Sequence, residues 1–74
     1  PARAIIRNYN LLGTNGNQLD IALDLEVMPE VYPAFSGKTR LFIREEDIPK
    51  YQPGSELKVK YDLYENEKIV VDPD

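Results

Sequence analysis

The sequence predicts an all-β fold, a small OB-like barrel of five or six antiparallel strands with one short helical turn. Residues 18–28 alternate apolar and polar side chains along their whole length, turn-forming residues separate several shorter alternating segments, and the positions expected to face outward are polar. Because a flat sheet of this kind would leave an apolar face in water, we expect it to curl around a single core.

The first two strands are expected to form a hairpin. Residues 2–9 mix apolar and basic side chains in an imperfect alternation, and residues 11–17, Leu-Leu-Gly-Thr-Asn-Gly-Asn, provide the asparagines and glycines typical of a type I′ turn. Residues 18–28 then place five apolar side chains on one face, which predicts antiparallel pairing and a definite register. These five are Leu19, Ile21, Leu23, Leu25 and Val27.

Residues 29–37 are expected to form an extended loop, because two prolines and a glycine do not suit a central strand. The loop contains three large apolar side chains, Val31, Tyr32 and Phe35. One or two of them could fold back to close an open end of the core. Alternatively, Tyr32 and Phe35 form a contact surface for a partner, and the sequence does not separate these interpretations.

The next elements are a third strand and a short helical piece. Alternation over residues 38–43 predicts the strand, and residues 44–51 are compatible with one or two helical turns. Pro49 suits only the first turn of a helix, so this piece must be short. We expect Ile48 and Tyr51 to point into the core.

The chain is expected to end in two further strands. Pro53-Gly54 is typical of a type II turn, in which glycine takes the positive φ at the third position. Alternating residues 56–62 predict the fourth strand and residues 68–72 the last. Asp62 is expected to cap the turn between them through its side-chain oxygens.

Length and composition limit the possible functions. With 74 residues the chain forms one domain, 1–74, which buries only about 60% of its unfolded surface. Without cysteine or histidine, disulfides, thiolate metal sites and histidine chemistry are excluded. The net charge of -4 disfavours nucleic acid as a partner. Since no apolar run approaches the roughly 20 residues of a membrane span, we expect no membrane insertion by this segment.

The ends of the chain suggest that it is part of something longer. It begins at Pro1 without an initiator methionine and ends in the acidic residues 70–74. We therefore expect a segment excised from a longer protein.

Enzymatic activity is not predicted. Catalysis requires a nucleophile beside a base, or two carboxylates in a sheltered cleft. The two serines, Ser36 and Ser55, lie in turn-like contexts. We therefore assign no catalytic residue and no cofactor.

A metal site is not predicted either, although three carboxylates share one face of the long strand. Asp20, Asp24 and Glu26 supply the oxygen ligands that hard cations prefer. Side chains on a strand diverge, however, and Lys38 and Arg40 on the next strand offer opposite charges. Cross-strand ion pairs are therefore the favoured interpretation.

Single-stranded oligonucleotide binding is the alternative function. OB folds bind single strands with a basic groove and stacking aromatic rings. The residues that resemble such a face are Lys38, Arg40, Phe42, Lys58 and Lys60. A groove of this kind needs positive potential and at least two stacking rings, whereas the chain is acidic and offers one ring. A solvated, charge-balanced face explains the same residues.

Motifs along nearly the whole chain resemble a widespread bacterial domain of unknown function. They are Leu25-Glu26-Val27 with Pro29, then Ile48-Pro49, Pro53-Gly54, Leu57, Val59, Tyr61-Asp62, and finally Ile69 to Asp72. The family usually continues Tyr-Asp with proline, whereas residues 63–67 stand here instead. The resemblance implies a β-barrel-like module in a bacterial, membrane-associated parent protein, with an interaction role and no established activity. We therefore expect a non-enzymatic module that makes protein contacts.

Overall fold

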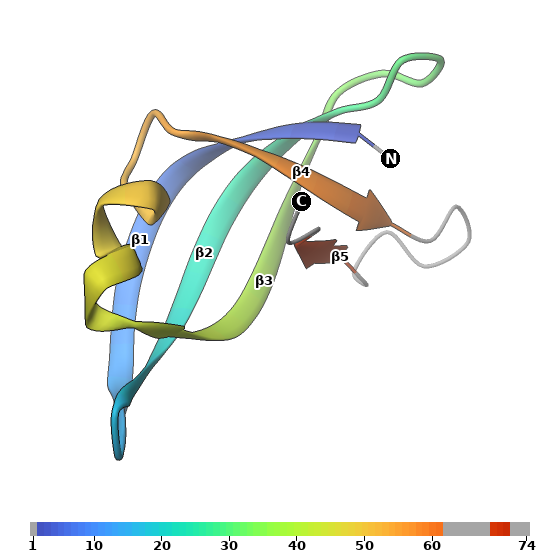
Figure 1. The fold of residues 1–74 in the computed structure, drawn as a ribbon. Helices are drawn as coiled ribbons and strands as arrows, with labels where there is room; N and C mark the ends of the chain where they lie inside the picture. Colours follow the sequence, from blue (N-terminus) through green and yellow to red (C-terminus); the bar gives the residue numbers. More distant parts are fainter. Residues whose placement is uncertain (1, 62–68, 72–74) are drawn as a thin grey trace.

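The computed structural model describes residues 2–61 and 69–71, which form five strands and one 3-10 helix. The strands make one antiparallel sheet in the order β3-β2-β1-β4-β5. The sheet curls until its two edge strands, β3 and β5, meet (Figure 1). The predicted small antiparallel barrel is thus confirmed, with five strands. Their bounds are β1 (Ala2–Asn15), β2 (Gln18–Met28), β3 (Phe35–Arg44), η1 (Glu45–Tyr51), β4 (Glu56–Tyr61) and β5 (Ile69–Val71).

Strand β1 is longer than the sequence predicts. It does not stop at Tyr9 but pairs with β2 as far as Asn15, which lies opposite Gln18. Two extra residues, Arg7 and Leu12, interrupt the register of this pairing. Such bulges bend a strand and increase its twist, which allows β1 to follow the curvature of the barrel.

Both tight turns use glycine at positive φ. Gly16 has a φ of +62° and Asn17 does not take positive φ, so the hairpin turn is of the II′ kind and the predicted type I′ is wrong. Type II′ requires positive φ only at its first central residue, where glycine adopts it without steric cost. At the second turn Gly54 has a φ of +93° and the Ser55 N–H donates to the Gln52 carbonyl over 3.0 Å, as predicted for type II.

The core lies between the inner faces of the curled sheet. On β2 the predicted alternation holds, with four side chains buried and Leu19 partly buried. Ile48 and Tyr51 of η1 pack against this core, as expected. Buried apolar residues from all five strands complete it: Ala2, Ala4, Ile6, Ile21, Leu23, Leu25, Val27, Ile43, Val59 and Ile69.

The barrel closes at a seam between β3 and β5 that is held by side chains. In the described part of the chain, no strand pairing joins β3 to β5. Instead, the Thr39 hydroxyl donates to the Ile69 carbonyl over 2.9 Å, and the rings of Phe35 and Tyr61 meet edge to face with centroids 5.4 Å apart. Gly37 leaves the space that Cδ1 of Ile69 fills, because a Cβ atom at this glycine would overlap it.

We predict that Gly37→Ala lowers the free energy of unfolding by about 1–3 kcal/mol, the usual cost of overpacking. Ile69 is only 5% exposed, so its side chain has little room to move away. Urea denaturation measures the change.

The matched control is Gly13→Ala, where an added Cβ atom has no neighbour within 4 Å. We expect it to change stability by less than about 0.5 kcal/mol. Ile69→Val removes the overlapping methyl group and should recover part of the loss when combined with Gly37→Ala. Additive losses in the double variant would contradict the overlap.

Candidate functional site

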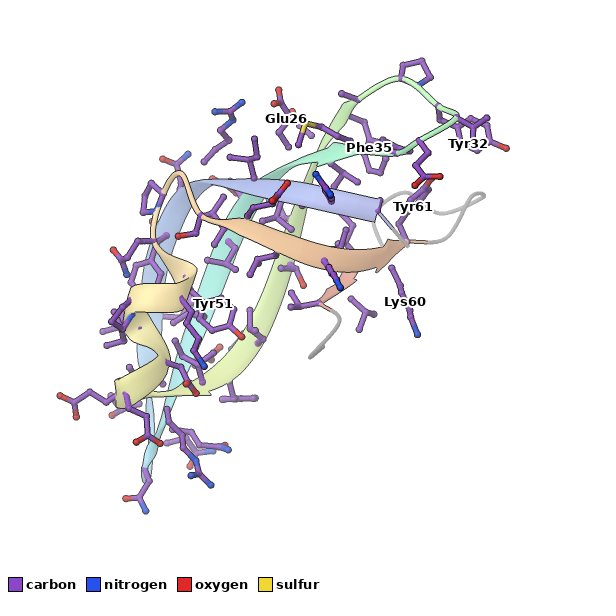
Figure 2. The ribbon with its side chains drawn as sticks, turned by 45° about the horizontal axis from the view of Figure 1, so that its top comes forward. Glu26, Tyr32, Phe35, Tyr51, Lys60 and Tyr61 are labelled. Carbon is purple, nitrogen blue, oxygen red and sulfur yellow. The ribbon has the colours of Figure 1, made fainter. Side chains whose placement is uncertain are left out.

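The loop between β2 and β3 carries Val31, the most exposed large apolar side chain among the described residues, with exposed Tyr32 beside it. Val31 is 86% exposed and Tyr32 is 53% exposed. Figure 2 shows Tyr32 on this loop, directed away from the barrel. Both side chains are therefore available for contact with another molecule.

Phe35, the other residue of the predicted contact, lies in a different environment. It opens β3 opposite Val27, is half-buried against the core and packs on Tyr61 at the seam. One of the three apolar residues thus folds back onto the core while two remain outside. The contact hypothesis therefore continues with Val31 and Tyr32.

Other exposed apolar side chains lie along the sheet. Leu11 and Leu12, which the sequence assigned to the first turn, belong to β1 and are about half exposed. Because successive side chains on a strand point to opposite faces, two adjacent leucines cannot both face the core. The Leu11-Leu12 pair thus indicates an exposed apolar side chain, which the sequence analysis did not identify. Phe42 points outward from β3 as predicted, and Val70 of β5 is exposed as well.

Each of the three carboxylates of β2 accepts a hydrogen bond from a side chain on a neighbouring strand. The predicted cross-strand ion pair is confirmed for Asp20 with Arg40. Its carboxylate accepts from Nε of Arg40 over 2.8 Å and also from Nη2 of Arg40. Lys38 has no carboxylate within 4 Å among the described residues, so its predicted pairing is wrong. The other two partners come from β1: Arg7 donates to Glu26 over 2.5 Å, and Asn8 donates to Asp24 over 3.2 Å.

The pairing of these carboxylates is relevant to metal binding. Within residues 2–61 and 69–71, no group of three or more acidic residues is placed to hold a metal ion.

The hydrogen bonds from Arg40 lower the pKa of Asp20 below its ordinary value, against the opposing effect of burial. The same hydrogen bonds raise the pKa of Arg40. The Asp20 side chain is only 14% exposed, so Arg40 largely replaces its solvent.

The five residues of the alternative nucleic-acid face fall into two groups. Lys38, Arg40 and Phe42 lie on the outer face of β3, whereas Lys58 and Lys60 lie on β4. Strands β2 and β1 separate β3 from β4 within the sheet, and across the seam β5 lies between them except where Phe35 contacts Tyr61 of β4. Lys60 projects from β4 away from the barrel (Figure 2). The sheet order therefore does not gather these residues into one groove.

Comparisons with protein-family models, with curated proteins and with solved structures found no match to this chain. The resemblance to a bacterial domain of unknown function therefore stays a prediction. Of its motif residues, Pro53 and Gly54 form the predicted turn, while Asp62 lies outside the described residues. Among the described residues, no helix combines the length and apolar character needed to cross a membrane.

We predict that Phe35→Ser and Tyr32→Ser have different effects on stability. Phe35→Ser should lower the free energy of unfolding by about 2 kcal/mol, because it removes a half-buried ring from the seam. Tyr32→Ser should change it by less than about 0.5 kcal/mol, because the side chain is exposed. Thermal and urea unfolding of both variants measure this, and equal losses would contradict the separation.

We also predict that Asp20 contributes to the dependence of stability on pH. Because its pKa is lower in the folded state, its contribution is present above the unfolded pKa and is lost as pH falls through the folded pKa. The parent should therefore be more stable than Asp20→Asn at neutral pH. The two unfolding curves should converge in acid, and a constant difference at all pH values would contradict this role.

Proposed function

We propose that this chain is a non-enzymatic β-barrel module that makes protein–protein contacts through the loop between β2 and β3. The observation that carries the proposal is the adjacent exposure of Val31 and Tyr32. Tyrosine offers a large, rigid contact area with a polar end, and such residues often dominate binding energy at protein interfaces.

The barrel supports this loop at both ends. Val27 is fully buried and lies opposite Phe35, which packs at the seam. Pro29 and Pro33 restrict the backbone between these two anchors. A loop that is held this way loses less conformational entropy when it binds, which favours a contact role.

The biological setting is part of the proposal. We infer a bacterial, membrane-associated parent protein from the sequence resemblance. Single-stranded oligonucleotides remain the competing ligand, because β3 presents three cations and an exposed ring on its outer face.

The test is site-specific photo-cross-linking in the natural full-length protein in its own cells. A photoreactive amino acid in place of Tyr32 should give one discrete adduct with another polypeptide, and the additional change Val31→Ser should abolish it. The control places the same group at Asn10, an exposed outer position on β1. No adduct at position 32, or equal adducts at both positions, would refute the loop as a contact surface.

The competing ligand has its own measurement. In an NMR titration with mixed single-stranded oligonucleotides at low salt, we expect no shifts at Lys38, Arg40 or Phe42. Shifts there that disappear at higher salt would favour nucleic-acid binding instead, because contacts with phosphates weaken steeply with salt.

A further inference from the structure

Among the described residues, strand β3 pairs with another strand along one edge only. Its ten residues all lie opposite residues of β2. On its other edge lies β5, whose first residue, Ile69, meets β3 at Gly37 and Thr39. In the part of the chain that the structure describes, no strand pairs with residues 40–44 on that side. We call this stretch the free edge.

We propose that the free edge binds an extended acidic segment of a partner protein by β-strand addition. This inference rests on the proposed function, because it names the kind of protein that the module contacts. Unpaired N–H and C=O groups along a strand form a template for another strand, and the side chains beside them decide which strand fits.

The side chains along the free edge determine which partner sequence pairs with it. Arg40, Phe42 and Arg44 point outward, and both arginine side chains are at least 66% exposed. Arg40 pairs with Asp20, and Nη1 of Arg44 lies 3.6 Å from Oε1 of Glu46. The Arg44–Glu46 pair is exposed on both sides, and because such pairs contribute little, Arg44 can exchange Glu46 for a carboxylate of a partner. Leu41 and Ile43 point inward to the core. An antiparallel strand in register would place acidic residues opposite the two arginines and an apolar residue opposite Phe42. The favoured partner segment is therefore acidic, three apolar residues, then acidic.

The same charges disfavour a second copy of this chain. Antiparallel self-pairing centred on Arg40 places this arginine opposite itself. Centring on Leu41 places Lys38 opposite Arg44, and centring on Phe42 places Arg40 opposite Arg44. Like charges that lie directly opposite on neighbouring strands are destabilising. These three registers are thus disfavoured, whereas centring on Ile43 places Phe42 opposite Arg44 without like charges. An acidic strand meets no repulsion from the arginines in register.

The test uses the full chain and a blocked synthetic peptide with the sequence Glu-Val-Tyr-Val-Glu. In NMR spectra of the labelled protein, the peptide should shift the amides of residues 40–44 and slow their hydrogen exchange. A peptide with lysine in place of both glutamates should not. Arg44→Glu should weaken binding about three- to tenfold. The matched control is Arg3→Glu, the same charge change at an exposed position on β1, which should leave binding unchanged.

Three outcomes would overturn the proposal. The first is slow exchange at residues 40–44 before any peptide is added, which would mean that the same chain already covers this edge. The second is equal binding of the basic peptide. The third is no change in the spectra at millimolar acidic peptide. The cross-linking result at position 32 is independent of all three, so failure of the free edge is distinguishable from failure of the loop.

Discussion

Closure of the barrel at the seam is the constraint on which the rest of the structure depends. Without it the inner faces of both edge strands would be exposed to water. A single hydrogen bond and one aromatic pair contribute only about 1 kcal/mol each, and no ladder of backbone bonds joins β3 to β5 in the described chain. Closure therefore relies on shape, namely the fit of Ile69 into the space at Gly37.

Much of the fold could be predicted from the sequence because one face of each strand is buried. Along β2 the alternation of apolar and polar residues is unbroken, so its bounds and inner face follow directly. Along β1 it is not, because each extra residue, Arg7 and then Leu12, reverses the pattern. A rule based on a period of two does not follow the strand through such bulges, and the prediction ended the strand at Tyr9 because residues 11–17 have the composition of a turn.

The candidate site was less predictable because it depends on which elements become neighbours. The sequence places Tyr32 and Phe35 in one loop, but only the pairing of Phe35 with Val27 moves that ring into the seam. The carboxylates of β2 show the same limit. Their common face follows from spacing, whereas the pairing of Asp24 with Asn8 requires the bulge at Arg7, which turns Asn8 outward. Strand order likewise decides that the basic residues of β3 and β4 do not meet.

The free edge follows from a mismatch in strand length. At about 3.3 Å per residue, the three residues of β5 extend roughly 10 Å, whereas the ten residues of β3 extend roughly 33 Å. Seam contacts at Phe35, Gly37 and Thr39 use only the first half of β3. The second half of β3 is then an edge without a described partner strand, and such an edge tends to pair with other chains. Charged side chains oppose this pairing, and the arginines of β3 have that effect. Because Asp20 holds Arg40 on the side of β2, this charge stays fixed at the sheet surface instead of moving freely in solvent. Asp20 neutralises part of the Arg40 charge, so Arg44, whose pair with Glu46 is exposed on both sides, contributes most of the attraction for an acidic strand. Protection from identical strands and selectivity for an acidic one therefore come from the same residues.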